Sequence, residues 1–250
     1  MNTIVQPFPE LGKFDRQARL ELAAKIFDDI RALSVDGPGV SRDSYGPGEQ
    51  AAIDYCADLA RHEGLDVRFD EAANLIMELP GKDPDAPCIV CGSHLDSVPQ
   101  GGNFDGAAGV IAGLISLIRM KREGVVPPRT VRTMAIRGEE SAWFDLCYLG
   151  SSALFGELAA DDLDRTHRVT GRTLGEYMSD AGAAVERIRN GERMIDTADI
   201  AAYIELHIEQ GPVMVAKDLP VGVVTGLRGN IRHAEITCRG EAGHAGALPR

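Results

Sequence analysis

The sequence predicts an α/β fold: a layered domain with a mixed, largely parallel sheet flanked by helices, followed by the start of a smaller α+β domain. Short apolar runs bounded by Gly, Pro, Asp and Asn indicate strands, and apolar residues at helical spacing indicate helices. Strand, helix and strand alternate between residues 87 and 136, which is typical of a layered α/β arrangement. With 250 residues, 44% of them hydrophobic, the chain can build a sizeable core.

The predicted elements are distributed along the whole chain. Apolar residues at helical spacing predict helices at residues 14–33, 48–61, 106–122, 151–158 and 174–181. Short apolar runs predict strands at residues 65–69, 74–79, 87–91, 130–136 and 200–208. Two more runs, 221–225 and 231–238, follow Pro212 and predict strands of the smaller domain. The expected domains are therefore 1–212 and 213–250.

Charge and hydropathy exclude several kinds of partner. A net charge of -12 without a basic cluster argues against nucleic acid, because phosphates would be repelled. Residues 1–19 lack an apolar secretory core, and the longest apolar run, 110–118, is far shorter than the roughly 20 residues of a membrane span. Five cysteines, an odd number, favour a reducing compartment. We expect a soluble, cytoplasmic protein without nucleic-acid or membrane partners.

Histidine and carboxylate side chains follow the predicted strand 87–91. His94 and Asp96 lie in Gly-Ser-His-Leu-Asp-Ser, and Asp105 lies in the glycine-rich Gly-Gly-Asn-Phe-Asp-Gly. Ligands of open α/β sheets gather beyond the carboxyl ends of strands, and this donor set suits zinc, manganese or cobalt. Asp105 is the candidate bridge between two ions, and Asp96 is placed to orient the imidazole. An ordinary surface turn is the alternative, whereas the glycines match neither nucleotide-binding signature.

Three later segments add further candidate site residues. Glu139 and Glu140 follow the strand 130–136, and their side chains leave the backbone in different directions, so one can bind metal while the other moves a proton. The alternative is a pair of solvated glutamates. His207 faces away from the aliphatic side of the predicted strand 200–208, although a hydrogen-bonded strand histidine would look the same. His244 lies in a small-residue loop that admits a ligand closely.

In this order, the motifs resemble the hydantoinase/carbamoylase branch of the dinuclear metal amidohydrolases and peptidases. That branch contains N-carbamoyl-L-amino acid hydrolase, allantoate amidohydrolase and β-ureidopropionase. The resemblance covers nearly the whole chain, and its most specific part is Glu-Leu-His-Ile-Glu-Gln-Gly-Pro around His207. Gly-His-Ala-Gly around His244 also matches. One segment departs from the family: Ser141-Ala142-Trp143-Phe144 stands where relatives usually carry Gly-Ser-Arg-Phe, so a different pocket lining is expected.

The resemblance implies a site with two divalent ions, Zn²⁺ or Mn²⁺, with Co²⁺ or Ni²⁺ as alternatives. Its implied metal ligands are His94, Asp105, Glu140 and His207. One ion would bind to His94, Asp105 and His207, and the other to Asp105 and Glu140. Glu139 would be the general base and Asp96 its supporting carboxylate. Gln210 and His244 would contact the substrate, with His244 on a hinged lid.

The implied reaction is hydrolysis of a linear amide C–N bond by a metal-activated water. Its substrate would be an N-carbamoyl amino acid or a related ureido compound such as allantoate. A dipeptidase, an N-acyl-amino-acid deacylase and a non-catalytic metal-binding module remain as alternatives. Residues 1–212 would form the metal-binding catalytic domain, and residues 213–250 the beginning of a lid domain that joins a homodimer. A final histidine ligand and an arginine for the substrate carboxylate are expected beyond Arg250.

Overall fold

The computed structural model describes residues 14–226 and residue 237 of the chain. The chain divides into two compact units, Met1–Ile208 and Glu209–Arg250. The first unit contains a five-stranded sheet with helices on both faces, and the second contains the short helix α7 (Val213–Ala216). None of the described helices combines the length and the apolar character that a membrane crossing requires.

The sheet of the first unit is mixed, as the sequence predicts. Its strands are arranged in the order β3-β4-β6-β5-β7. They are β3 (Asp66–Phe69), β4 (Leu75–Leu79), β5 (Cys88–His94), β6 (Val131–Ile136) and β7 (Ile200–Ile204). The β3–β4 and β4–β6 pairs are antiparallel, whereas β5 runs parallel to both β6 and β7. The carboxyl ends of three parallel strands therefore meet at one edge.

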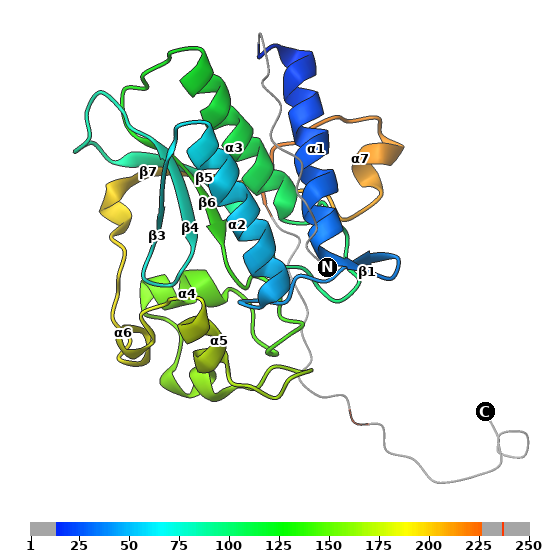
Figure 1. Cartoon of the computed structure of the whole chain (residues 1–250), viewed down its shortest axis with the longest axis vertical. Coiled ribbons are helices and arrows are strands. Elements are labelled where there is room, and N and C mark those ends of the chain that lie inside the picture. The colour runs from blue at the N-terminus through cyan, green and yellow to red at the C-terminus, as the bar shows by residue number, and fades with distance from the viewer. Residues whose placement is uncertain (1–13, 227–236, 238–250) are drawn as a thin grey trace, which may run out of the picture. The chain divides into compact units, whose positions relative to one another are not determined.

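Three helices cover one face of this sheet and lie side by side (Figure 1). They are α1 (Arg16–Ser34), α2 (Pro47–His62) and α3 (Ala107–Arg122). Leu75, Met77 and Leu79 of β4 point into the core beneath them, because alternate strand residues face the same side. Burial of this apolar surface is the main stabilisation of the layer. The predicted helices 14–33, 48–61 and 106–122 correspond to these three within a few residues.

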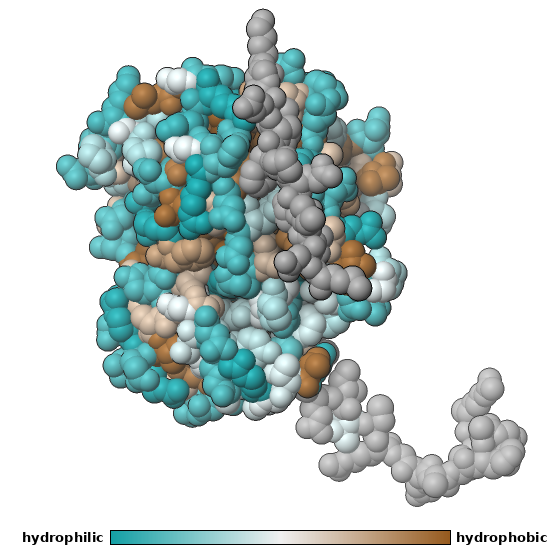
Figure 2. Space-filling view, in the orientation of Figure 1, coloured by the Kyte–Doolittle hydropathy of each residue, from teal (hydrophilic) through white to brown (hydrophobic). Residues whose placement is uncertain are grey.

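The other face of the sheet carries a second apolar core. Ile76, Val90 and Met134 point to this side and pack with residues of three short helices. These are α4 (Leu149–Phe155), α5 (Leu174–Asp180) and α6 (Val185–Arg189). Turns of 3-10 helix occur at Ala160–Asp164 and Thr197–Asp199. On the molecular face seen in Figure 2, hydrophilic residues predominate and the exposed hydrophobic residues form small separate groups.

The structure corrects two expectations about strands. β7 ends at Ile204, so the prediction of a strand over 200–208 is wrong, and His207 lies beyond the strand. Apolar alternation continues to Ile208, but pairing with β5 stops at Cys91↔Ile204. No strand forms at 221–225, where the second unit offers no partner strand among its described residues. The predicted strand 231–238 lies outside the described residues except for residue 237.

A short hairpin was not foreseen. It pairs β1 (Val35–Asp36) with β2 (Gly39–Val40) directly after α1. Each strand has only two residues, which is too short for a period-two pattern to be visible in the sequence. The hairpin leads into the segment 41–46 that precedes α2, and this segment reaches the functional site.

Candidate metal centre

His94 is the last residue of β5, and its side chain is buried. Its Nδ1 atom lies 3.2 Å from Asp96 Oδ1 and 3.1 Å from the backbone oxygen of Asp96. Two oxygen acceptors at Nδ1 favour the tautomer that carries the proton there, so the lone pair is on Nε2. Nε2 points to the side on which Glu139 lies, 3.7 Å from its Oε2 atom. Asp96 thus orients the His94 imidazole so that Nε2 could act as a metal ligand.

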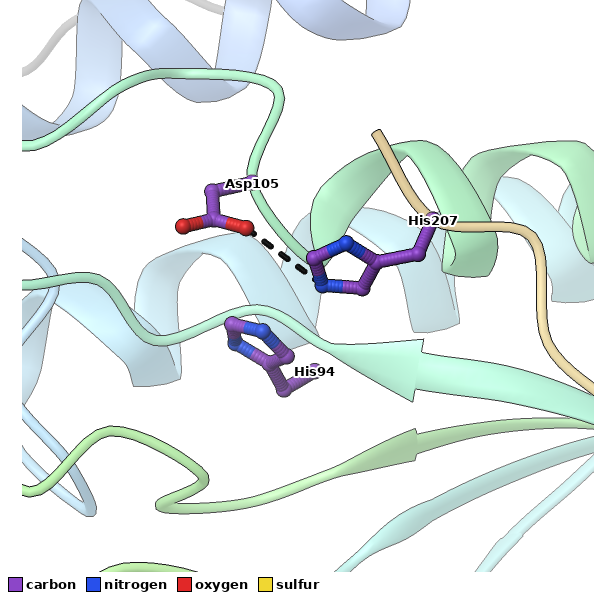
Figure 3. A group of neighbouring side chains, drawn as sticks. All are labelled: His94, Asp105 and His207. Carbon is purple, nitrogen blue, oxygen red and sulfur yellow. Dashed lines mark ion pairs between the residues drawn. The ribbon is translucent and has the colours of Figure 1, made fainter. Parts of the chain in front are cut away.

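Asp105 and His207 lie opposite this imidazole. Asp105 precedes α3, and His207 follows β7, so the three side chains converge from three separate segments (Figure 3). His207 Nε2 lies 3.4 Å from Asp105 Oδ1, and its Nδ1 lies 2.8 Å from the backbone oxygen of Ile208. One ligand atom from each of His94, Asp105 and His207 lies within 4.8 Å of the other two.

Glu139 and Glu140 form a second group with His94, again with ligand atoms within 4.8 Å of one another. Both follow β6 after Arg137 and Gly138. Burial, followed by the negative charge of Glu139, raises the pKa of Glu140 to about 7. Burial also raises the pKa of Glu139. Each carboxyl group therefore holds a proton more readily than an exposed glutamate.

The electrostatics of His94 show how acidic its surroundings are. Burial on its own would lower the pKa of His94, but the hydrogen bond to Asp96 and the neighbouring carboxylate charges raise it to about 9. The surroundings of His94 thus stabilise a positive charge on the imidazole. A divalent cation that took the place of the imidazolium proton would be stabilised by the same carboxylates.

Asp96 connects the two groups. Its carboxylate is completely buried and accepts hydrogen bonds from the backbone N–H groups of Glu139, at 3.1 Å, and Glu140, at 3.0 Å. The Ser44 hydroxyl donates a third bond to Asp96 Oδ2 at 2.7 Å. The sequence predicts the orientation of the imidazole by Asp96, and the geometry adds the positioning of both glutamates.

Gly106 provides the space that the centre requires. Its φ of +62° lies in the left-handed region, and a Cβ atom here would come within 2.4 Å of the His94 ring. Any larger residue would therefore displace the imidazole as well as strain the backbone. Gly106 therefore has a steric role in the turn that follows Asp105.

The donor chemistry of both groups fits divalent metal ions. One group offers two imidazole nitrogens and a carboxylate, and the other offers one imidazole and two carboxylates. Neutral imidazole and carboxylate oxygen are common ligands of zinc, manganese and cobalt. His94 belongs to both groups, whereas the family resemblance implies Asp105 as the shared ligand. The site residues present therefore fit a metal centre at the carboxyl edge of the sheet.

The two remaining predicted residues lie outside the first unit. Gln210 belongs to the second unit and has a φ of 55°. His244 lies outside the described residues. Trp143, in the segment that departs from the family pattern, is buried: its Nε1 donates to the Ser97 oxygen at 2.7 Å, and its ring stacks on His167 at 5.3 Å. Trp143 therefore packs into the second apolar core.

Sequence reasoning missed several buried polar residues behind the site. Arg42 is fully buried, its Nε donates to the Leu95 oxygen at 2.5 Å, and its backbone N–H donates to Ser97 Oγ at 3.0 Å. It thus fixes the chain on both sides of Asp96. No motif marks Arg42 or Ser44, and only long-range contacts distinguish them from surface residues of the same type.

An α/β fold with clustered histidine and carboxylate ligands at its strand ends defines a class of metal-site proteins, and the comparisons agree with that class. Residues 74–171 match the family described as Peptidase family M28. The chain is 42% identical over 211 residues to an N-carbamoyl-L-amino acid amidohydrolase of Geobacillus stearothermophilus, covering 84% of this chain and 51% of the relative. It is 33% identical over 183 residues to an allantoate amidohydrolase of Bacillus subtilis, covering 73% and 43%.

The solved structures agree. A hydantoinase/carbamoylase family amidase from Burkholderia ambifaria superposes with a TM-score of 0.66 at 33% identity, over 78% of this chain and 47% of that one. Over the residues that match, the chain is therefore similar to members of the hydantoinase/carbamoylase family. It spans about half the length of the relatives that it matches.

Proposed function

We propose that the protein is a metal-dependent amidohydrolase that cleaves a linear amide C–N bond. Its substrate is an N-carbamoyl amino acid or a related ureido compound such as allantoate. The observation that carries the proposal is the convergence of His94, Asp105 and His207, together with the second group that His94 forms with Glu139 and Glu140. The names of the relatives, N-carbamoyl-L-amino acid amidohydrolase and allantoate amidohydrolase, support this choice of substrate class.

The proposed roles combine the positions of the side chains with the two ligand sets that the family resemblance implies. His94, Asp105 and His207 hold one divalent ion, and Asp105 and Glu140 hold the second. The ions are Zn²⁺ or Mn²⁺, with Co²⁺ or Ni²⁺ as alternatives. When bound, they acidify a water molecule and polarise the scissile carbonyl group. Asp96 keeps the His94 imidazole in the ligating tautomer through its contact with Nδ1.

Glu139 is the proposed general base. Its side chain is partly exposed, at 35%, so a substrate can reach it, while its backbone N–H is fixed by Asp96. A raised carboxyl pKa brings a glutamate closer to the pH at which it can both accept and return a proton. Glu139 takes the proton from the attacking water and delivers it to the departing nitrogen.

The remaining assignments come from the family. Residues 1–212 form the catalytic domain, and residues 213–250 begin a lid domain through which two copies form a homodimer. Gln210 and His244 contact the substrate. The protein acts in the cytoplasm, and its net charge of -12 favours a small-molecule substrate over nucleic acid.

The test is a screen for ammonia release by the full-length protein with added Zn²⁺ or Mn²⁺. N-carbamoyl amino acids, allantoate and ureidoglycolate are compared with N-acetyl amino acids and dipeptides. We expect ammonia from at least one ureido substrate and no turnover of the acetylated compounds. Release of amino acids from only the acetylated or dipeptide substrates would favour a deacylase or dipeptidase. Stoichiometric metal without any hydrolysis would favour a non-catalytic module.

A further inference from the structure

A buried ion pair lies behind the glutamate pair and belongs to neither ligand group. Arg137 Nη1 is 3.0 Å from Glu49 Oε2, and the two side chains are 1% and 0% exposed. Burying two charges costs several kcal/mol per ion, which the attraction between them offsets only when the geometry is good and further hydrogen bonds are made. The presence of a buried ion pair is therefore weak evidence that the pair serves only to stabilise the fold. Its other contacts indicate a different role.

Glu49 reaches the segment that carries the glutamates. It lies in the first turn of α2, and its Oε1 atom accepts a hydrogen bond from the backbone N–H of Gly138 at 2.9 Å. Its Oε2 atom accepts another from the Tyr45 N–H at 2.7 Å. The carboxylate thus ties the start of α2 to the residue directly before Glu139.

Arg137 is held at every nitrogen of its guanidinium group. Besides Glu49, it donates from Nε to the Ala73 oxygen at 2.7 Å and from Nη2 to Gln50 Oε1 at 2.5 Å. A guanidinium with this many fixed acceptors has little freedom to move. The backbone to which it is attached is therefore fixed as well.

Four consecutive backbone N–H groups, those of residues 137–140, are each bound to a side-chain oxygen. Arg137 donates to Asn74 Oδ1 at 2.8 Å and Gly138 to Glu49 Oε1, while Glu139 and Glu140 donate to the two oxygens of Asp96. Gly138 adopts a φ of 62°, so the segment cannot continue β6 and its N–H groups need other acceptors. Oxygen atoms of buried side chains accept the hydrogen bonds that a neighbouring strand would accept in a sheet.

We propose that Glu49 and Arg137 are positioning residues that set where Glu139 and Glu140 stand relative to His94. This inference rests on the proposed function, in which Glu139 moves the proton and Glu140 holds an ion. A misplacement of about 1 Å in a catalytic group can cost on the order of a hundredfold in rate. The pair acts through the Gly138 amide and touches neither substrate nor metal.

The variant Glu49→Asp tests this role in the full-length protein. It keeps a negative charge beside Arg137 but withdraws the carboxylate by one methylene from the Gly138 N–H. We expect kcat to fall at least tenfold with KM within about twofold, and the affinity for the second of two Zn²⁺ ions, measured by calorimetric titration, to fall at least threefold. The affinity for the first ion should stay unchanged.

The matched control is Ile26→Ala, which removes a buried side chain of α1 that has no contact with residues 137–140. At temperatures well below each Tm, this control should keep the wild-type kcat and both metal affinities even if it is the less stable variant. If Glu49→Asp also kept the wild-type kcat and affinities, the inference would be overturned. A loss of kcat in both variants in proportion to Tm would overturn it too.

Should Glu49→Asp not fold, Gln50→Ala carries the test. It removes one acceptor of Arg137 at a partly exposed position, and we expect kcat to fall two- to threefold at unchanged Tm. A wild-type kcat would overturn the inference. Failure of the proposed function is recognised separately, because the wild-type protein would then show no ureido hydrolysis before any variant is made.

Discussion

Residues 137–140 and residues 205–208 bring side chains to the same centre, yet they are held in different ways. Every backbone N–H of the first segment is bound to a buried side-chain oxygen. The second segment follows the edge strand β7, where Tyr203 and Ile204 are 47% and 57% exposed. Within the second segment, the Glu205 side chain accepts a hydrogen bond from the Ser93 hydroxyl of β5 at 2.6 Å, and just before it the Tyr203 hydroxyl of β7 donates to the Gly92 oxygen at 3.2 Å.

This difference separates the segment that carries the proposed proton-transfer groups from the segment that carries His207. The groups proposed to move protons are fixed before any ligand arrives, which is the arrangement expected where reacting groups must be preorganised. His207 is exposed, and its ring lies beside the Asp105 carboxylate, the backbone oxygen of Ile208 and the His94 ring, whose centroid is 6.2 Å away. A bound cation would therefore order the His207 side more than the glutamate side.

The strongest test of the glutamate side is Glu139→Gln. Loss of a general base lowers turnover by roughly 10²- to 10⁴-fold, while the isosteric amide keeps the backbone in place. Metal content, measured by atomic absorption, should stay as in the wild-type protein. Glu140→Gln is the matched contrast, since it should lower both turnover and metal content. Equal loss of metal in the two variants would refute the division of roles.

Asp96→Asn tests the connection between the glutamates and His94. The neutral amide cannot accept from all the donors that surround this carboxylate, so His94 and both glutamate N–H groups are held less firmly. We expect Zn²⁺ affinity to fall about 10- to 100-fold in calorimetric titrations, as for other residues that orient metal ligands. Asp85→Asn, at an exposed position, is the control and should bind like the wild type.

Metal affinity should rise with pH. In the metal-free site the pKa of His94 is raised to about 9, so the imidazole is protonated at pH 7 and must lose that proton to bind a cation. Below about pH 9, each unit by which the pH is raised should therefore increase the metal affinity roughly tenfold, and the increase should be steeper below about pH 7, where Glu140 is also protonated. Titrations from pH 6 to 8 check this. An affinity independent of pH in that range would contradict the acidic environment described for His94.

The smallest expected effect is the difference in the free energy of unfolding between alanine variants of His94 and His207, measured without metal. His94→Ala removes a buried, hydrogen-bonded ring and should lower the free energy of unfolding by about 1–3 kcal/mol. His207→Ala removes an exposed ring, and its cost should stay within about 0.5 kcal/mol. Urea denaturation in the presence of a chelator measures both. Equal costs would mean that the two sides of the site are equally preorganised.

Much of the fold follows from local patterns, and so do the ligand candidates. Helices α1 to α3 have clear apolar periodicity, and His94 and Glu139 are found because they follow strongly apolar strands. The end of β7 could not be predicted, because apolar alternation continues to Ile208 after backbone pairing has stopped. Strand length there depends on the partner strand, which a local pattern does not contain.

The buried polar contacts behind the site were equally hidden. Glu49 looks like an acidic residue in the first turn of a helix, where it would be favourable at the surface. Its role becomes visible only through the contact with Gly138, 89 positions away in the chain. Pairings of such long range leave no periodic trace in one sequence, so structure is needed to find them.

The most direct test of the metal centre is anomalous diffraction at the zinc edge from crystals grown with Zn²⁺. We predict an ion about 2.0–2.2 Å from the Nε2 atoms of His94 and His207 and from a carboxylate oxygen of Asp105. Zinc bound only to other residues, with these three side chains left without an ion between them, would contradict the account.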